Sequence, residues 1–363
     1  MRVLLVSNGF QPNYEKGFAN GLAHNGISVE LIGADRTLYA ELLPGIKAIN
    51  LRGSQDPKRP KMVKAVTLLT YVVKLYAHIY ASRPRVLHFN GLLLGGVGVM
   101  ALGELVLYRL GSKKLWLTVH NVVPHDKHVE TNRLLMRLMY RVPHLLVTHT
   151  EKMKRDLMRE FGVPAGRIVV MEHGVDEVPA TTTQPLPSPS LKVLLFGGVM
   201  PYKGVDIFLQ ALSFCSDMAV DATIAGESRN VGYALEIEKM ISEVVLPHRV
   251  NWVRGFVPEQ AVQSYFEQAD VVVLPYRHID QSGVLFTAFR FGTPVVCFDV
   301  GAFRDYVPEY AGLVVPSQTA QALANGLRTF LNHIGNYDRK AIQTYARSFS
   351  WENTVRVLLP HLA

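Results

Sequence analysis

The stretch LLFGGVMPYKGVDIFLQAL, residues 194–212, has the pattern of a β-strand that passes through a glycine turn into a helix. Gly197 and Gly198 follow the apolar strand, and Lys203 comes just before a helix that begins near Val205. Glycines let a ligand approach the backbone, a helix N-terminus favours negative charge, and a lysine adds a point charge suited to a diphosphate. The spacing is not that of a Walker loop. A lysine in a turn is usually only solvated, so this stretch alone leaves a phosphate site and a plain turn both open.

The same strand-to-helix alternation extends along the whole chain. Apolar strand-like runs, separated by helix-length segments, begin near residues 2, 28, 85, 115, 144, 167, 192, 221, 250, 271, 294 and 312. Residues 175–190 interrupt the pattern with Pro, Thr and Ser and no apolar period, which is typical of a linker. Continuous apolar strands that alternate with helices predict parallel sheets covered on both faces. We therefore predict an α/β chain of two doubly wound Rossmann-like domains in tandem, with ligands bound in a cleft between them.

A second strand-to-helix turn lies in PYRHIDQSGVLFTAFRFGTPVV, residues 275–296. Asp280, Gln281, Ser282 and Gly283 stand where a buried strand leads into a helix. The unpaired N–H groups of a first helical turn form an anion site, so a phosphate cradle is one interpretation. An ordinary helix capped by Asp280 or Ser282 is the other.

Length and composition limit the class of protein. With 363 residues, 48% of them hydrophobic, the chain is long enough for two domains. Two cysteines, Cys215 and Cys297, argue against a disulfide scaffold or a four-cysteine zinc site. The N-terminus does not resemble a signal peptide, so we expect the protein to stay where it is made. Residues 91–110 are apolar but contain several glycines and Glu104, and we expect a loop and a buried helix there.

The basic character of the chain belongs to its first half. Residues 1–175 hold 24 Lys and Arg against 12 Asp and Glu, whereas the whole chain has a net charge of only +8. This asymmetry favours a polyanionic partner, namely a membrane surface, a lipid phosphate or nucleic acid, although solvated helix faces are the alternative. Nucleic acid is disfavoured because no recognised module is present. We expect peripheral attachment to anionic lipid, with the apolar face of residues 61–83 mostly in the core.

Several segments together resemble the large family 4 of glycosyltransferases, which have the GT-B fold. FGGVMPYKGVD, ATIAGES, VRGFVPEQAVQSYFEQADVVVLPY and DQSGVLFTAFRFGTPVVCFDVGAFRDYV are similar to its donor-binding domain, while LTVHNVVPH and VVMEHGVD are similar to its N-terminal domain and hinge. The resemblance implies an acceptor-binding domain at 1–174, a linker at 175–190, a nucleotide-sugar-binding domain at 191–347, and a C-terminal helix at 348–363 that returns to the N-terminal domain.

The resemblance also assigns donor contacts. Lys203 matches the lysine that contacts the donor diphosphate. Gly198 stands where the family usually has a second cation, an arginine, so that cation is missing or is supplied elsewhere, by Arg229 or Arg277. The loop at 255–257 matches the one that reads the nucleobase through its backbone. The full expected donor-binding set is Gly197, Gly198, Lys203, Gly255, Phe256, Val257, Gln281, Ser282, Gly283, Val284, Leu285 and Thr287.

The catalytic assignments are less regular. The family typically carries two glutamates eight positions apart, and this chain has Asp280 near the first and Thr287 near the second. A carboxylate near the sugar can stabilise the positive charge of the transition state, so Asp280 is one expected catalytic residue. His120, which ends the strand-like LTVH, is the other. Expected acceptor contacts are Asn13, Glu15, Lys16 and His125.

The function implied is transfer of a hexose from a UDP- or GDP-sugar to a lipid-linked or polysaccharide acceptor, with retention of anomeric configuration. No Asp-x-Asp motif is present, and we expect no metal and no cofactor. The expected location is the cytoplasm, peripherally on the inner face of the membrane. A nucleotide-sugar epimerase of the same fold and an inactive nucleotide-sugar-binding subunit are the alternatives.

Overall fold

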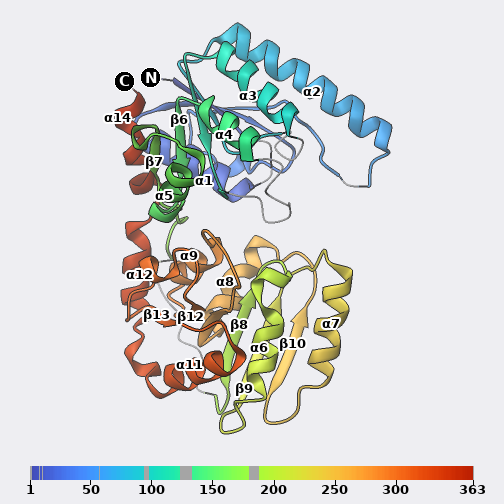
Figure 1. Cartoon of the computed structure of the whole chain (residues 1–363), viewed down its shortest axis with the longest axis vertical. Helices are drawn as coiled ribbons and strands as arrows, with labels where there is room; N and C mark the ends of the chain where they lie inside the picture. Colours follow the sequence, from blue (N-terminus) through green and yellow to red (C-terminus); the bar gives the residue numbers. More distant parts are fainter. Residues whose placement is uncertain are drawn as a thin grey trace. The chain divides into compact units, whose positions relative to one another are not determined.

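The computed structural model describes residues 2–7, 9, 11–56, 58–93, 98–122, 133–179 and 188–362. The chain forms two compact units (Figure 1). Met1–Asp176 and Phe349–Ala363 make the N-terminal unit, and Glu177–Ser348 makes the C-terminal unit. Each unit is a parallel sheet with helices on both faces, so the predicted pair of doubly wound α/β domains is confirmed. The acceptor- and donor-binding roles of the two units remain predictions.

The N-terminal unit contains a seven-stranded sheet of order β3-β2-β1-β4-β5-β6-β7. The strands are β1 (Arg2–Val6), β2 (Ser28–Gly33), β3 (Lys47–Asn50), β4 (Val86–Phe89), β5 (Lys114–Thr118), β6 (Leu145–Thr148) and β7 (Ile168–Val170). Alternate residues of β1 point to opposite faces, because side chains alternate along a strand. Leu4 and Val6 join one core cluster, while Val3 and Leu5 join the other.

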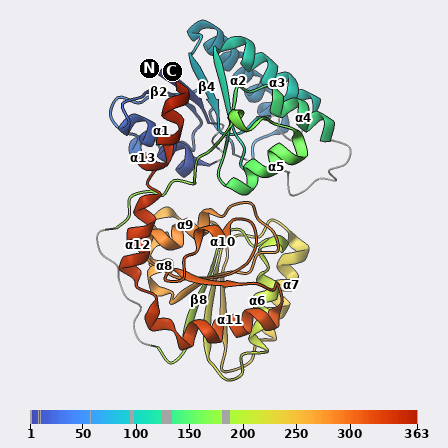
Figure 2. The same cartoon turned by 60° about the vertical axis from the view of Figure 1, so that its left-hand side comes forward.

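Different helices cover the two faces of this sheet. The helices are α1 (Pro12–His24), α2 (Lys61–Ser82), α3 (Val99–Gly111), α4 (Arg133–Arg141), α5 (Glu151–Phe161), α13 (Trp351–Thr354) and α14 (Leu359–Leu362). Helices α2 to α5 contribute to the core on one face, and α1 packs with the C-terminal helices on the other, as Figure 2 shows. The Ser350 hydroxyl caps α13 by accepting from the N–H of Asn353, as expected for a helix that begins there.

Trp351 anchors the C-terminal segment to the N-terminal unit. A Cβ atom at Gly17 or Gly174 would overlap the Trp351 ring, and one at Gly21 would come to 2.6 Å from the Trp351 carbonyl oxygen. The Tyr14 ring packs edge-on against the indole, with centroids 4.9 Å apart. Gly17 and Gly174 therefore create the slot that the Trp351 ring fills, and Gly21 lets α1 approach the Trp351 backbone.

The C-terminal unit contains a six-stranded sheet of order β10-β9-β8-β11-β12-β13. The strands are β8 (Leu191–Phe196), β9 (Val220–Ala225), β10 (Arg249–Val253), β11 (Val271–Leu274), β12 (Val295–Phe298) and β13 (Gly312–Val315). The helices are α6 (Val205–Leu212), α7 (Val231–Ser242), α8 (Glu259–Gln268), α9 (Gly283–Arg290), α10 (Phe303–Tyr306), α11 (Ala320–Asn332) and α12 (Arg339–Ser348). The strand order reverses between β8 and β11, and ligands of doubly wound sheets bind at such switch points.

Two expectations about helix burial were wrong. In α2 only Tyr71, Leu75 and Ile79 are buried, so most of its apolar residues are exposed rather than in the core. In α3 the exposed residues include Val99 and Leu110, so this helix is not buried as expected. Helical periodicity identifies residues that share a face, but it does not say what covers that face.

Candidate functional site

The loops after β8 and β11 meet at the switch point of the C-terminal unit. Gly204 has φ +68°, and a Cβ atom there would overlap the carbonyl oxygen of Pro275. Gly226, in the loop after β9, packs equally closely on the carbonyl of Gly197. Glycine is required at these positions because the loops touch backbone to backbone. The close approach brings both strand-to-helix turns singled out in the sequence to one edge of one sheet.

Lys203 lies at the centre of this edge, at the end of a short 3₁₀ turn (Pro201–Lys203). Its ammonium nitrogen is 5.5 Å from the centre of the Tyr276 ring, and a Cβ on Gly197 would come to 2.8 Å from it. Burial lowers the pKa of Lys203. Among the residues that the structure describes, no hydrogen-bond acceptor or carboxylate partners this nitrogen. A desolvated cation without a partner is costly, and a bound anion would compensate it.

The N-terminus of α9 adds hydrogen-bond donors. Ser282 occupies the N-cap position but its side chain makes no capping bond, so the interpretation of Ser282 as the cap of this helix is wrong. The first-turn N–H groups of Gly283 and Val284 have no partner within the helix. Leu285 is different, because its N–H donates to the carbonyl of Ser282 and its side chain is buried. In the described part of the chain, Gln281 Nε2 is buried without a hydrogen-bond partner.

Asp280 and Thr287 flank these donors. The loop after β12 packs on the backbone of Asp280, since a Cβ on Gly301 would come to 3.2 Å from the Asp280 carbonyl oxygen. Thr287 lies one turn into α9, and its hydroxyl donates to the Gly283 carbonyl at 2.9 Å. Both residues therefore lie beside the α9 N-terminus, and their roles remain predictions.

The two arginines proposed to replace the missing diphosphate cation differ. Arg277 forms a paired interaction with Asp206, at 2.9 Å to Oδ1 and 2.5 Å to Oδ2, and Tyr233 donates to the same carboxylate at 2.6 Å. Burial would raise the pKa of Asp206, but the bonds from Arg277 and Tyr233 outweigh it and hold that pKa low. Arg229 is exposed in the loop after β9, with no ion pair in the described residues. Of the two, Arg229 is therefore the available cation.

The predicted nucleobase loop follows β10. Gly255 has φ +103°, and Val257 is half-buried. The ring of Phe256 is 88% exposed, which is unusual for a large aromatic side chain. The loop thus presents both its backbone and an aromatic surface to solvent.

The N-terminal unit gathers histidines at the carboxyl ends of three neighbouring strands. His120 follows β5, His149 follows β6 and His173 follows β7. The Tyr14 ring contacts all three, with centroid distances of 5.0, 5.5 and 5.6 Å. Burial lowers the pKa of His120 to about 4 and that of His173 to about 4, and it lowers the pKa of His149 well below its usual value. The sequence interpretation missed His149 and His173, although each follows a strand as His120 does.

Both ring nitrogens of His120 are engaged. Nε2 lies 2.8 Å from the Asn90 carbonyl oxygen, and Nδ1 lies 3.3 Å from His149 Nε2. His149 Nδ1 in turn lies 2.9 Å from the Met171 carbonyl oxygen. These three contacts need three protons, one more than two neutral imidazoles carry. A proton added to this pair would complete the chain of hydrogen bonds, and burial opposes it.

The residues predicted to contact the acceptor have different environments in the N-terminal unit. Lys16 forms ion pairs with Glu41 at 2.9 Å and Asp176 at 3.1 Å, and these carboxylates raise its pKa against the opposing effect of burial. Glu15 is buried, and Asn13 is exposed at the start of α1. His125 lies outside the described residues. Lys16 is thus committed to structural ion pairs.

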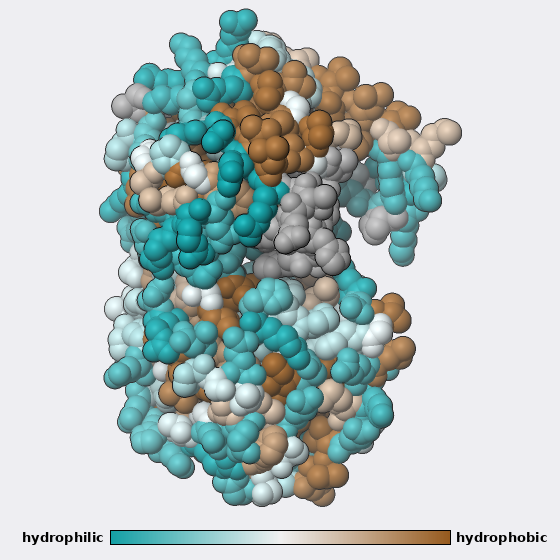
Figure 3. Space-filling view, in the orientation of Figure 1, coloured by the Kyte–Doolittle hydropathy of each residue, from teal (hydrophilic) through white to brown (hydrophobic). Residues whose placement is uncertain are grey.

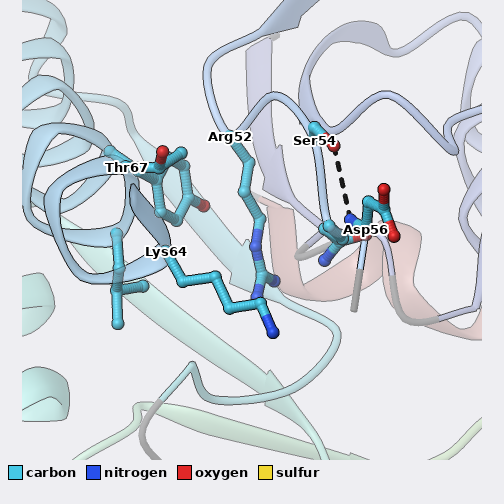
Figure 4. A pocket seen from close by; sticks show the side chains of 8 residues that line it. Arg52, Ser54, Asp56, Lys64 and Thr67 are labelled. Atoms are coloured by element: carbon cyan, nitrogen blue, oxygen red, sulfur yellow. Dashed lines mark hydrogen bonds between the residues drawn. The ribbon is translucent and has the colours of Figure 1, made fainter. Parts of the chain in front are cut away.

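A cationic cavity of about 310 Å³ lies between the start of α2 and the segment after β3. Figure 4 shows the side chains of Arg52 and Lys64 extending into it beside each other. Its lining residues are Arg52, Ser54, Gln55, Asp56, Lys64, Thr67, Leu68 and Tyr71. The Arg52 guanidinium lies 5.8 Å from the Tyr71 ring centre. No metal-binding group of three or more His, Cys, Asp or Glu residues occurs in the described ranges.

A pair of doubly wound units, each with its polar loops at the carboxyl edge of a parallel sheet, defines the GT-B fold class. Two family models match this chain, Glycosyltransferase Family 4 over residues 13–178 and Glycosyl transferases group 1 over residues 191–333. The chain therefore belongs to the group 1, family 4 type of glycosyltransferases.

Curated proteins similar in sequence to this chain are named as glycosyltransferases. The D-inositol 3-phosphate glycosyltransferase of Xylanimonas cellulosilytica is 29% identical over 59% of this chain and 55% of its own length. The protein of that name from Corynebacterium urealyticum is 25% identical over 95% of this chain and 88% of its own. The match spans only about half the length of other relatives, such as 49% of the Salinispora tropica protein.

Solved structures share the fold. Sucrose-phosphate synthase from Thermosynechococcus elongatus has a TM-score of 0.75 at 20% identity, covering 98% of this chain and 96% of its own. Anabaena Alr3699/HepE, solved in complex with UDP-glucose, has a TM-score of 0.73 at 17% identity, covering 100% and 99%. These likenesses confirm the predicted GT-B architecture.

Proposed function

We propose that this protein transfers a hexose from a UDP- or GDP-sugar to a lipid-linked or polysaccharide acceptor. One observation carries the proposal: the desolvated ammonium of Lys203 has no ionic partner in the described residues and lies near the α9 N-terminus. A Cβ on Gly197 would come to 2.8 Å from the Lys203 ammonium and to 3.6 Å from Val284 Cγ2 in the first turn of α9. Such a site suits a diphosphate, because a point charge and unpaired N–H groups both favour phosphate oxygens. The UDP complexes of Anabaena Alr3699/HepE, a protein of the same fold, support a nucleotide-sugar donor.

The catalytic part of the proposal places Asp280 near the sugar. Glycosyl transfer develops positive charge at the anomeric carbon and ring oxygen, which a neighbouring carboxylate stabilises. Gln281 Nε2 and the first-turn N–H groups of α9 would hold phosphate or sugar oxygens. His120, in the N-terminal unit, is the second catalytic residue of the proposal. We propose retention of anomeric configuration, without metal or cofactor, on the family resemblance.

The acceptor part of the proposal uses the cavity of Arg52 and Lys64. Two cations against one carboxylate, Asp56, line this cavity, and this balance favours an anionic group such as the phosphate of a lipid-linked acceptor. The basic first half of the chain supports a location in the cytoplasm, on the inner face of the membrane. A role in polysaccharide biosynthesis follows if the acceptor is a growing glycan.

A panel of UDP-, GDP- and ADP-hexoses tests the proposal by thermal shift, followed by release of nucleoside diphosphate in the presence of membrane lipid extract. A donor at a hundred times its Kd stabilises the protein by about 2.7 kcal/mol. We expect one donor class to stabilise the protein and to be turned over with acceptor. A 2-epimer formed without acceptor would indicate the epimerase, and binding without turnover would indicate an inactive subunit. Stabilisation by no donor would contradict all three.

A further inference from the structure

An exposed apolar surface covers three neighbouring helices of the N-terminal unit. On α2 the most exposed apolar residues are Met62 (79%), Leu69 (67%), Val73 (60%) and Val66 (59%). On α3 they include Val99 (74%) and Leu110 (70%), and on α4 Leu134 (70%). Figure 3 shows hydrophobic side chains gathered on the part of this unit where Figure 1 places α2 and α3. We call these residues, with Met100, Val106, Leu107 and Leu138, the apolar face.

The helices that bear the apolar face are held together by direct contacts. A Cβ on Gly111 of α3 would come to 2.6 Å from Ile79 Cγ2 of α2, and the Tyr80 hydroxyl donates to the Leu107 carbonyl at 3.1 Å. The Arg109 guanidinium of α3 donates to the Val142 carbonyl just after α4 at 2.9 Å. The apolar face is therefore one surface, and contiguous patches of this kind mark interaction sites.

The sequence of α2 divides its apolar residues between two opposite sides. Met62, Val66, Leu69, Val73 and Tyr80 recur at intervals of three, four or seven residues and so share one side of the helix. Tyr71, Leu75 and Ile79 form the opposite side and are buried in the core of the unit. Three side chains thus pack α2 onto the core of the unit, and a second apolar stripe on the opposite side of the helix stays exposed.

The exposed charges on the three helices that bear the apolar face are all positive. Helices α2, α3 and α4 carry Lys61, Lys64, Lys74, Arg109, Arg133, Arg137 and Arg141, all exposed. Their one acidic residue, Glu104, is buried and accepts a hydrogen bond from the Tyr108 hydroxyl at 2.8 Å. Outside these helices, Glu160 of α5 lies 3.7 Å from Arg133. An apolar surface rimmed by cations is complementary to anionic lipid.

We propose that the apolar face is a monotopic membrane-docking surface that inserts into one leaflet of an anionic bilayer. This extends the proposed function by naming the partner of the N-terminal unit, and it rests on a separate observation from the donor site. Attachment is then by insertion as well as by charge. The cavity of Arg52 and Lys64 shares α2 with the apolar face, so a lipid-borne anionic group would reach it from the membrane.

Two other occupants fit less well. By length and composition α2 is the one helix of the described residues that is able to cross a bilayer. However, it connects β3 to β4 of one parallel sheet and buries Tyr71, Leu75 and Ile79 in that unit, so it lies on the membrane rather than across it. A second copy of the chain would set cations against cations across a symmetric interface, which destabilises it.

Flotation with lipid vesicles tests the proposal directly. We expect the protein to bind vesicles that contain phosphatidylglycerol more tightly than vesicles of phosphatidylcholine alone, and to keep part of its binding at high salt. The double substitution Leu69→Glu, Val73→Glu should lower binding at least roughly tenfold, because two large apolar side chains leave the bilayer. The matched control is Val231→Glu, Leu235→Glu on α7, which are 74% and 60% exposed and have the same spacing. The control should bind as the wild type does.

Three outcomes would overturn the proposal. The first is that high salt releases the wild type completely and the Leu69→Glu, Val73→Glu variant binds vesicles normally. Surface charge alone would then explain the attachment. The second is a wild-type dimer, by sedimentation velocity without lipid, that the variant converts to monomer. The third is no vesicle binding at all. Thermal unfolding checks that both variants fold, and nucleotide-sugar binding should persist in both, so a failure here is distinct from a failure of the donor site.

Discussion

The ammonium nitrogen of Lys203 lies 2.8 Å from the position that a Cβ atom would occupy on Gly197. Gly197 also has φ +91°, which an L side chain rarely adopts. The turn after β8 is thus shaped so that the lysine side chain can lie against the backbone and point to the switch point. Gly197 and Lys203 are six positions apart, and the absence of a side chain on Gly197 leaves the space that the Lys203 ammonium occupies.

Gly197→Ala should therefore damage binding and stability together. The left-handed backbone costs about 1–2 kcal/mol for a non-glycine residue, and the new methyl group must displace the ammonium. We expect a lower melting temperature and weaker nucleotide-diphosphate binding. Gly335→Ala is the matched control, because its Cβ would meet no atom within 4 Å. If the Gly197→Ala protein bound nucleotide as the wild type does, the turn at Gly197 would not be part of the nucleotide site.

Asp280→Asn separates catalysis from helix capping. Ser282, not Asp280, occupies the N-cap position of α9, and an Asn at position 280 would keep the capping ability that an Asp has. We expect a melting temperature close to that of the wild type and a transfer rate at least tenfold lower, or about 1.4 kcal/mol of transition-state stabilisation. Asp221→Asn, at an exposed position in β9, controls for the loss of one charge. Normal turnover by Asp280→Asn would leave the N–H groups of α9 and Lys203 as the working site.

Arg229→Gln tests which cation supplements Lys203. Arg277 is ion-paired with Asp206. Arg229 is exposed and lies two residues after Glu227, whose carbonyl oxygen accepts from the Val199 N–H beside Gly198, where the family usually has an arginine. We expect Arg229→Gln to weaken binding of a nucleoside diphosphate roughly three- to tenfold, the scale of a partly exposed charge interaction. Arg249→Gln, at the amino end of β10, should have no effect. An equal loss in both variants would indicate a general charge effect instead.

The buried histidines predict acid sensitivity of the N-terminal unit. Burial lowers the pKa of His88 to about 3 and those of His120 and His173 to about 4, all below the ordinary value of 6.5. The unfolded chain therefore binds more protons than the folded one once the pH falls below 6.5. Stability is fully present above that pH and is lost as the pH falls toward 4, at about 1.4 kcal/mol per pH unit for each histidine that titrates only when unfolded.

Urea unfolding monitored by tryptophan fluorescence measures this dependence. Trp116 and Trp351 report on the N-terminal unit, and Trp252→Phe removes the signal of the C-terminal unit. The free energy of unfolding should fall steadily below about pH 6.5, and the His120→Gln, His149→Gln double variant should show a shallower slope. A free energy that is constant or rises as the pH falls would contradict the burial of neutral histidines.

The strand pattern could be predicted from the sequence because parallel strands buried on both faces are continuous apolar runs. Strand β3 (Lys47–Asn50) escaped that pattern, since it lies at the sheet edge and none of its residues is fully buried. In the same way, the turns at Gly197 and Gly283 have local signatures. The two turns meet at one switch point because of the order of the strands in the sheet, and the hydrophobic periodicity of the sequence does not predict that order.

Pairings between distant residues were not predictable. Arg277 had been a possible phosphate ligand, but Asp206 lies 71 positions away in sequence and only the fold brings the two together. The histidines at 149 and 173 carried the same strand-end signal as His120, yet only the sheet shows that the three strands are neighbours. The apolar residues of α2 were assigned to the core for a similar reason, because composition does not distinguish a buried stripe from an exposed one.

Calorimetric titration of Lys203→Ala with nucleoside diphosphate and its sugar tests the central claim most directly. The wild type should bind the nucleotide at one site, and the substitution should weaken binding by roughly 1.5 to 3 kcal/mol, the scale of a hydrogen bond to a charged group. Lys239→Ala, an exposed lysine of α7, should bind as the wild type does. Unchanged affinity in Lys203→Ala, or no nucleotide binding by the wild type, would contradict the assignment of the switch point as the donor site.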